Sequence, residues 1–273
     1  MLSHPQAQPG HGRQQRSLRQ EYEEFILQRI EEFKERLSRE ELLAIADEAV
    51  RELEVEAEDQ LVLTEVLVLE HVDRLIMRRL NLPTFRRWRP RHLRLRKAQR
   101  EPRHWGLDPD SPLALTATAL PEDGVALVVG AGAAPAAFFL AAHDWPVLFI
   151  DRELSTVEAV ETRAASEALA VRFQALVVDL GEWFPEVDPT LVVMDGTALS
   201  ALAAQRREKF FSELKRHTAP GGVHYLMPVD KRRDAIPLGP SALKSHYGDW
   251  KTERMRLKNG TPWFAAAKPG HAP

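Results

Sequence analysis

The feature that most constrains the fold of this 273-residue chain is an apolar run that ends at two closely spaced glycines. Residues 125–129 consist of valine, alanine and leucine with no turn residue among them, so they predict a buried parallel strand. Gly130 and Gly132 follow, and residues without a Cβ permit a tight turn in which a ligand lies against bare backbone. Pro135 then suits the first turn of a helix, where no backbone N–H is needed.

A second apolar run, residues 147–150, ends in Asp151, which stands about 20 residues after the glycines. A carboxylate at the tip of a second strand can accept hydrogen bonds from ribose hydroxyls. The two runs together predict a nucleotide-like cofactor at the carboxyl edge of a parallel sheet. A lone Gly-x-Gly is a weak signal, because a strand-to-helix turn needs glycine for its geometry alone, and that interpretation stays open.

The composition is that of a chain able to bury a core, with 44% hydrophobic and 28% charged residues. The chain has no cysteine, which excludes disulfides, thiolate metal ligands and cysteine nucleophiles. Residues 1–16 are rich in Gln, Pro, Gly and His and lack the apolar core of a signal peptide, and no apolar run reaches membrane-spanning length. We therefore expect a disordered tail over residues 1–16 and a cytoplasmic protein without a membrane anchor.

Three amphipathic helices are expected in the N-terminal part, over residues 17–37, 38–53 and 59–82. Ser17 and Ser38 each open a segment with the spacing of a capping box. The third helix is apolar over so much of its circumference that we expect it to be covered by other helices or by a second subunit. This pattern favours a homodimer formed through the N-terminal helices.

Charge is segregated along the same region. Residues 20–73 contain 18 Asp and Glu against 5 Lys and Arg, whereas residues 74–104 contain 12 Lys and Arg against one acid, Glu101. Arginines interleaved with aromatic residues over 85–103 suit nucleic acid, because guanidinium groups pair with phosphates and aromatic rings stack on bases. The candidate contacts are Arg86, Arg87, Trp88, Arg89, Arg94 and Arg96. We favour the alternative that these arginines neutralise the acidic helices upstream, because the two charge excesses are similar in size.

From residue 111 onward, helices alternate with short apolar strands, after a proline-rich linker. The pattern predicts a helical domain over residues 17–110 and a second domain over 111–273 with a parallel sheet covered by helices on both faces. A capping box at Ser155 and Glu158 would open one of these helices. Expected strands are 125–129, 147–150, 173–178, 190–194 and 223–227, followed by a hairpin of 251–257 with 263–267 around Asn259 and Gly260.

Acidic residues follow three successive strands of this pattern, as Asp151, Asp179 and Asp195. With the Pro-Gly-Gly turn at 220–222 and the reversed terminal hairpin, residues 111–268 resemble class I S-adenosylmethionine-dependent methyltransferases. The resemblance implies an α/β fold with a seven-stranded Rossmann-like methyltransferase sheet, parallel with a reversed final strand, preceded by an all-α N-terminal domain. It also implies S-adenosylmethionine as cofactor. Residues 247–250 and 264–268 are faintly similar to tellurite-resistance-type methyltransferases.

The resemblance also implies roles for individual residues. Gly130, Ala131 and Gly132 would line the methionine and ribose portion of the cofactor, and Asp151, followed by Arg152, would bind the ribose hydroxyls. Asp179 and Leu180 would contact the adenine, and Asp195 would face the methyl-transfer centre. The chain departs from the family at two positions, because Val128 stands where an acidic residue is usual and Ala134 replaces the third glycine. No catalytic residue and no metal cluster is evident, and we expect the scattered His217, His224 and His246 to be structural or surface residues.

Three hypotheses follow. The first is a methyltransferase for a small molecule, with the helical domain as a lid or dimer surface. The second is an RNA methyltransferase that docks through residues 85–103. The third is a catalytically inactive methyltransferase-like scaffold, which Val128 and Ala134 keep open. An NAD-binding Rossmann domain would explain neither Asp179 nor the final hairpin, so the small-molecule methyltransferase is our prediction.

Overall fold

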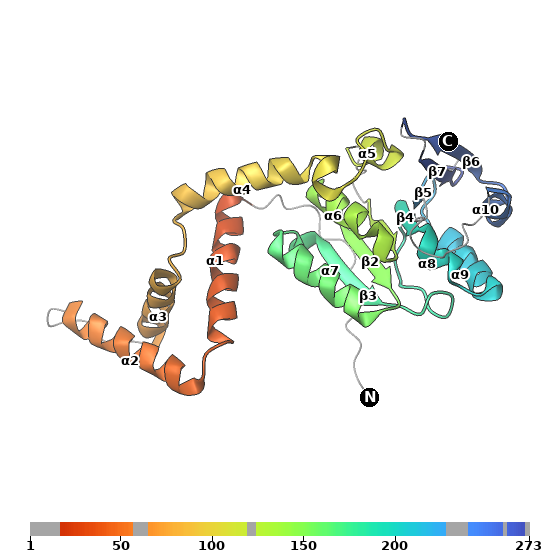
Figure 1. Cartoon of the computed structure of the whole chain (residues 1–273). Coiled ribbons are helices and arrows are strands. Elements are labelled where there is room, and N and C mark those ends of the chain that lie inside the picture. Colours follow the sequence, from red (N-terminus) through yellow and green to blue (C-terminus); the bar gives the residue numbers. More distant parts are fainter. Residues whose placement is uncertain (1–16, 57–64, 119–123, 228–239, 259–260, 271–273) are drawn as a thin grey trace. The chain divides into compact units, whose positions relative to one another are not determined.

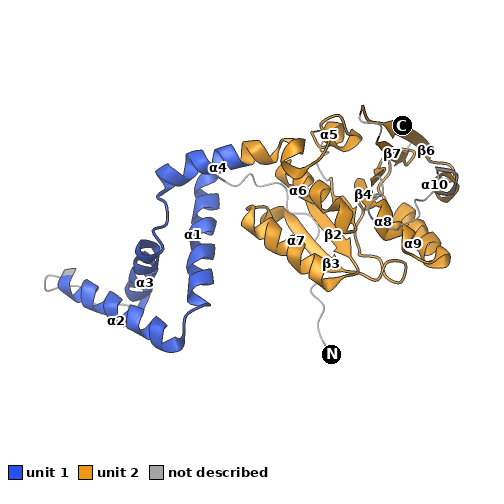
Figure 2. Cartoon of the chain, in the orientation of Figure 1, with its two compact units in different colours: residues 1–95 blue, residues 96–273 orange. Residues whose placement is uncertain are grey.

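A computed structural model describes residues 17–56, 65–118, 124–227, 240–258 and 261–270 (Figure 1). The chain divides into two compact units, residues 1–95 and 96–273 (Figure 2). The division falls inside one helix, α4 (Phe85–Gln99), whereas the sequence predicted a boundary at residue 110. The predicted tail over residues 1–16 and the predicted Asn259–Gly260 turn lie outside the described residues. Each unit has its own hydrophobic core.

The described residues of the first unit are helical. Its helices are α1 (Leu18–Lys34), α2 (Arg39–Glu56), α3 (Glu65–Arg79) and the first part of α4. Both predicted capping boxes are confirmed: Ser17 Oγ accepts a hydrogen bond from Gln20 N while Gln20 Oε1 accepts one from Ser17 N, and Ser38 and Glu41 repeat the arrangement. The apolar faces converge on a core of Tyr22, Ile26, Ile30, Ile45, Ala49, Val72, Leu75, Ile76 and Trp88.

Helix α3 buries only one of its faces within a single chain. The helix begins at Glu65, and its predicted start near residue 59 lies outside the described residues. It buries His71, Val72, Leu75 and Ile76, whereas the Val66 and Leu69 side chains are 64% and 56% exposed. Part of its apolar surface therefore lacks a cover from the described residues of the same chain, and the homodimer stays a prediction.

The second unit is built on one seven-stranded sheet in the order β3-β2-β1-β4-β5-β7-β6. Strands β1 to β5 pair in parallel, and β7 pairs antiparallel with both β5 and β6. The predicted α/β class and the reversed final strand are confirmed. The strands are β1 (Ala126–Val129), β2 (Val147–Asp151), β3 (Phe173–Val177), β4 (Leu191–Asp195), β5 (Val223–Met227), β6 (Lys251–Arg256) and β7 (Pro262–Ala267).

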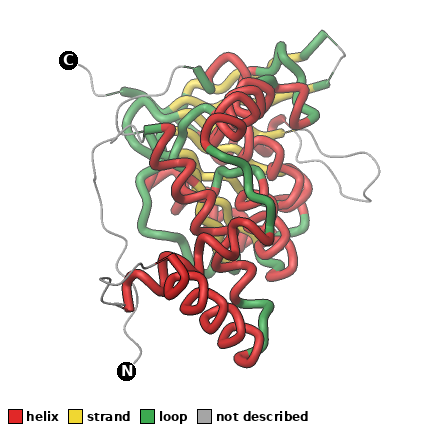
Figure 3. Tube along the Cα trace, turned by 90° about the vertical axis from the view of Figure 1, so that its left-hand side faces the viewer, coloured by secondary structure: helices red, strands yellow, loops and turns green. Residues whose placement is uncertain are grey.

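Helices cover both faces of this sheet (Figures 1 and 3). Ala126 and Val128 of β1 pack on the side of α6 (Ala134–Ala142) and α7 (Leu154–Ser166). Leu127 and Val129 pack on the other side, against α8 (Gly196–Ser200), α9 (Ala204–His217) and α10 (Pro240–Tyr247). A strand buried on both faces needs apolar residues at every position, which is why these strands read as continuous apolar runs. The remaining elements of the second unit are η1 (Pro102–Trp105), α5 (Pro112–Thr116), η2 (Ala131–Ala133) and η3 (Ala170–Arg172).

No helix among the described residues is both long and apolar enough to cross a membrane.

The capping box predicted at Ser155 is wrong. Helix α7 begins at Leu154, so its N-cap residue is Glu153, two residues before Ser155, and Glu153 makes no side-chain capping bond. The backbone N–H of Glu153 instead donates to Asp151 Oδ1 at 2.9 Å. The carboxylate at the end of β2 therefore makes the turn that leads into this helix, and the Ser155 pattern is not used.

A buried polar chain joins β5 to the helices on one face of the sheet. The Thr218 hydroxyl donates to Leu214 O, so it accepts from His224 Nε2, which lies 2.7 Å away. His224 Nδ1 then accepts from the Tyr247 hydroxyl at 3.0 Å. Burial is the main cause that lowers the pKa of His224 to about 3, and the nearby Lys268 and Lys215 act in the same direction. His224 is therefore a neutral structural residue, as the sequence predicted.

Replacing His224 by Gln should make the free energy of unfolding fall less steeply as the pH is lowered from 7 to 5. The unfolded chain binds a proton on this histidine near pH 6.5 but the folded chain only near pH 3, so the native protein loses stability as the pH falls between these values. The slope from this one residue reaches at most about 1.4 kcal/mol per pH unit. Urea unfolding at pH 7 and pH 5 measures the difference.

The matched control is Thr218→Val, which breaks the same buried chain but leaves the histidine in place. It should lower stability at both pH values and keep the acid-side slope of the unsubstituted protein. An unchanged slope in His224→Gln would contradict the assignment of a neutral buried histidine.

Candidate functional site

Most of the predicted site residues lie near the point where the order of the sheet changes direction. Strands β2 and β3 lie on one side of β1, and β4 and β5 lie on the other. Ligands of open α/β sheets bind at the carboxyl ends of the strands beside such a switch point. Gly130 follows β1, Asp151 ends β2 and Asp195 ends β4. We call these three residues and Gly132 the carboxylate cradle.

The Asp195 carboxylate ties two loops of the carboxylate cradle together. Its Oδ2 accepts from the backbone N–H of Gly132 at 3.0 Å, and its Oδ1 accepts from that of Thr197 at 2.8 Å. The second bond caps α8, so Asp195 is also the N-cap residue of this helix. With 5% of its surface exposed, Asp195 holds the turn after β1 against the start of α8.

The same carboxylate requires the glycine at position 132, while other contacts require the glycine at position 130. A Cβ on Gly132 would lie 2.6 Å from Asp195 Oδ2, which is closer than a real contact allows. A Cβ on Gly130 would lie 2.7 Å from the Cβ of Ala198, and Gly130 also has a φ of 91°, which disfavours any side chain. Both glycines are therefore required by the packing of the chain itself. Ala131, between them, is half-buried.

Asp151 retains capacity to bind a ligand. Its side chain is 6% exposed, and its Oδ1 is occupied by the N–H of Glu153. Among the described residues no partner is present for Oδ2, and a carboxylate oxygen can accept from a hydroxyl group. The neighbouring Arg152 is exposed and pairs with Glu153 at 3.0 Å, so its guanidinium is directed to the start of α7.

Asp179 and Leu180 differ in how far they are available to a ligand. Asp179 is exposed and pairs with Arg206 on α9, while its backbone oxygen accepts from the N–H groups of Glu182 and Trp183 in a turn. Asp179 therefore begins a turn in the loop after β3. Leu180 is 2% exposed and belongs to the core beneath α9, so its side chain is not available to an adenine ring. The contact predicted for Leu180 could therefore be made only by its backbone.

The carboxylate cradle has the chemistry that a cationic nucleoside cofactor requires. It combines two buried carboxylates with a turn free of side chains, and opposite charges attract strongly where water is scarce. Asp151 Oδ2 is the acceptor suited to ribose hydroxyls. Both oxygens of Asp195 are occupied by backbone N–H groups, so this residue shapes the site and adds negative charge to it.

Several solved structures resemble the chain in fold. The glycopeptide N-methyltransferase MtfA, complexed with (S)-adenosyl-L-methionine, is 15% identical, with a TM-score of 0.48 over 59% of this chain and 94% of that one. The N-methyltransferase NodS from Bradyrhizobium japonicum WM9 is 14% identical, with a TM-score of 0.45 over 66% and 96% of the two chains. An O-methyltransferase family protein from Burkholderia thailandensis is 12% identical, with a TM-score of 0.46 over 60% and 59%.

No protein-family model and no curated protein matches the chain. At these identities the likeness to solved structures concerns the fold and does not reach the residues of the carboxylate cradle. The faint similarity of the C-terminal segments to tellurite-resistance-type methyltransferases stays a prediction.

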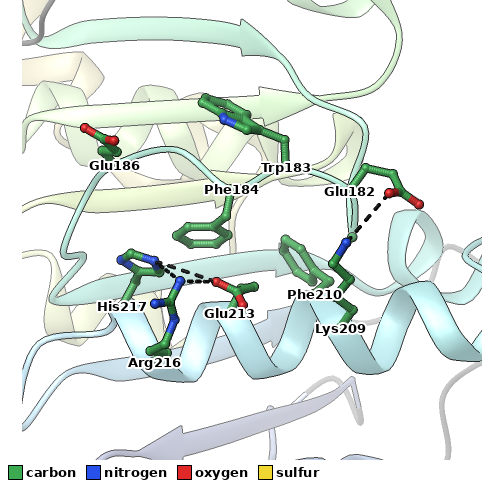
Figure 4. A pocket seen from close by; sticks show the side chains of 10 residues that line it. Glu182, Trp183, Phe184, Glu186, Lys209, Phe210, Glu213, Arg216 and His217 are labelled. Atoms are coloured by element: carbon green, nitrogen blue, oxygen red, sulfur yellow. Dashed lines mark hydrogen bonds and ion pairs between the residues drawn. The ribbon is translucent and has the colours of Figure 1, made fainter.

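A hollow of about 360 Å³ lies between the loop after β3 and helix α9, apart from the residues of the carboxylate cradle (Figure 4). Phe184 from the loop stacks on His217 of α9, with ring centroids 5.0 Å apart, while Glu213 pairs with Arg216. Trp183 beside them is 53% exposed. This hollow was not predicted from the sequence, where the signal for it is a pair of adjacent aromatic residues, Trp183 and Phe184, in a loop between strands.

The structure corrects the predicted basic surface for two of its six residues, Trp88 and Arg96. Trp88 is 7% exposed and stacks on His92 in the core of the first unit, so it cannot stack on a base. Arg96 belongs to the second unit and lies 3.6 Å from Asp144. Neither residue is thus part of an open arginine surface. Arg86, Arg87, Arg89 and Arg94 are exposed, as is Arg91, which the prediction had not singled out.

A double-mutant cycle should show that Asp195 is what excludes a side chain at position 132. Gly132→Ala should cost about 1–3 kcal/mol of unfolding free energy, because the new methyl group meets the Asp195 carboxylate. In an Asp195→Ala background that carboxylate is gone, so the same substitution should cost much less. Urea unfolding of the four proteins measures this coupling.

The control is Gly130→Ala, which should remain costly in both backgrounds. Its positive φ and the Ala198 Cβ are unaffected by the change at position 195. Equal costs of Gly132→Ala in the two backgrounds would show that something other than Asp195 requires this glycine.

Proposed function

We propose that the second unit binds S-adenosylmethionine at the carboxylate cradle and is a methyltransferase that acts on a small molecule. The observation that best supports this function is the combination of a free acceptor on buried Asp151 with a side-chain-free turn at the switch point of the sheet. A sheet of order β3-β2-β1-β4-β5-β7-β6 with β7 reversed is the arrangement that the resemblance to class I methyltransferases implied.

Each residue of the carboxylate cradle has a distinct part in this proposal. The bound cofactor supplies an activated methyl group on a sulfonium centre. Asp151 accepts hydrogen bonds from the ribose hydroxyls through Oδ2, and the backbone at Gly130 and Gly132 lets the sugar approach closely. Asp195 holds this turn in place and contributes negative charge close to the cationic groups of the ligand.

The rate enhancement would come mainly from positioning. Methyl transfer is a direct displacement, so a protein accelerates it by aligning the acceptor with the methyl group and by excluding water from the nucleophile. A general base is needed only where the acceptor carries a proton of high pKa. A small acceptor therefore requires a shaped surface near the carboxylate cradle rather than a dedicated catalytic side chain.

Isothermal titration should detect binding of S-adenosylmethionine and S-adenosylhomocysteine and no binding of NAD. Asp151→Asn should weaken both interactions roughly 10- to 100-fold, because hydrogen bonds to a charged carboxylate contribute about 1.5–3 kcal/mol. An asparagine oxygen can still accept from Glu153 N–H, so the turn into α7 is retained.

Asp188→Asn is the matched control. It removes a carboxylate that is 80% exposed and lies beside His217, which lines the hollow between the loop after β3 and α9 rather than the carboxylate cradle. Its affinity for both ligands should equal that of the unsubstituted protein. No heat with either ligand would refute the methyltransferase and favour the inactive scaffold, whereas binding of NAD alone would favour an oxidoreductase.

A further inference from the structure

The arginines of the basic segment fall into two groups that differ in their partners. Arg78 and Arg79 on α3 precede residues 85–103 in the chain, and they pair with Glu52 and Glu48 on α2. Farther along the chain, Arg96 and Arg100 pair with Asp144. The intervening stretch behaves differently. Among the described residues, no ion pair or hydrogen bond is formed by the side chains of Arg86, Arg87, Arg89, Arg91 and Arg94.

These five arginines lie on the face of α4 that points away from the core. Trp88 and His92 occupy the inner face, where Trp88 contacts Tyr22 and His92 lies 2.7 Å from the carboxylate of Glu21. The helical period then places the arginines outward. Arg87 and Arg91 are four residues apart, and Arg91 and Arg94 are three apart, so like charges are neighbours on the helix surface. This arrangement is unfavourable for the protein alone and becomes favourable when an anion is bound.

Most of these charged side chains line one hollow of about 780 Å³. Four of the five arginines line it, together with Thr84, Pro90 and the turn between α3 and α4 at residues 81–83. Helix α4 begins at Phe85, beside the hollow, so the partial positive charge of its first turn adds to the arginine charge.

We propose that this arginine hollow binds the sugar–phosphate backbone of a nucleic acid. Guanidinium groups pair with phosphates in two-pronged geometry, and unpaired arginines along successive turns match a chain of phosphates better than a single one. The aromatic residues of the segment are turned inward, with Trp88 in the core and Phe85 half-buried. Binding therefore acts through phosphates without base stacking and does not depend on base sequence.

The concave form of the surface favours this ligand over a lipid bilayer. A flat membrane would reach the rim of the arginine hollow, whereas a flexible strand can enter it. The site is built from the first unit alone and is independent of the proposed cofactor. Failure of one proposal therefore leaves the other intact.

Fluorescence anisotropy of the full chain with a labelled single-stranded RNA of about 20 nucleotides tests the proposal. Binding should weaken steeply as salt rises from about 50 to 200 mM, and two unrelated sequences should bind alike. The triple variant Arg87→Ala, Arg91→Ala, Arg94→Ala should lose at least about tenfold in affinity. Its slope of log affinity against log salt should be smaller by about 2, because each phosphate contact contributes about 0.7.

The matched control removes three cations that already have carboxylate partners, through Arg29→Ala, Lys209→Ala and Arg216→Ala. It carries the same change in net charge and should bind RNA like the unsubstituted protein. Replacing the three hollow arginines by lysine should restore the salt dependence but only part of the affinity, since an ammonium group keeps the charge and loses the two-pronged pairing. Circular dichroism should show all variants folded, because the substituted hollow residues are exposed.

Three results would overturn the proposal. The first is no anisotropy change at the lowest salt, and the second is an equal loss in the hollow and control variants. The third is co-sedimentation of the protein with phosphatidylserine vesicles at salt concentrations that abolish RNA binding, which would assign the arginines to a membrane surface.

Discussion

The carboxylate of Asp195 is the contact on which the carboxyl edge of the sheet depends. By accepting from Gly132 and Thr197, it fixes the turn after β1 and the start of α8 relative to each other. Charge-assisted bonds of this kind in a nearly dry place are stronger than neutral ones, so two adjacent loops are held rigid by one side chain. Asp151, at the end of β2 on the other side of β1, can then remain partly unsatisfied without loosening the edge, and that spare acceptor is what the proposed cofactor would use.

The sheet could be predicted from the sequence almost strand by strand, because strands buried on both faces leave continuous apolar runs. β5, for example, was expected at residues 223–227 and is found as Val223–Met227. Helix α10 and the start of α7 were not predicted. Helix α7 depends on a side chain bonding to the backbone two residues away, and this competes with the capping signal at Ser155. The confirmed assignments follow from periodicity, whereas the errors come from single contacts that periodicity does not encode.

In the candidate site, too, the sequence predicted where residues lie along the strands but not which side chains they contact. Sequence spacing placed Gly130, Asp151 and Asp195 at strand ends, which the structure confirms. It could not show that Asp195 points back onto the glycines, nor that Trp88 packs into a core beside exposed arginines. Which neighbours a side chain meets is decided by tertiary packing. For the basic segment, the similar total charges of the two regions concealed the fact that pairing is local. Arg96 and Arg100 pair with Asp144, whereas the arginines in the first part of α4 have no such partner among the described residues.

Helix α4 consequently carries two kinds of arginine along one continuous backbone. At its C-terminal end Arg96 and Arg100 converge on Asp144, which also receives Arg172. Toward its N-terminus the charges repel one another without a counterion among the described residues. Dissolved salt weakens both the attraction and the repulsion between charged side chains, with a screening length of about 10 Å at 0.1 M. Raising the ionic strength should therefore weaken the ion pairs that hold the last turns of this helix. It should also weaken the repulsion between the arginines of the first turns and so make those turns more stable. The two ends of a single helix would therefore fray under opposite conditions.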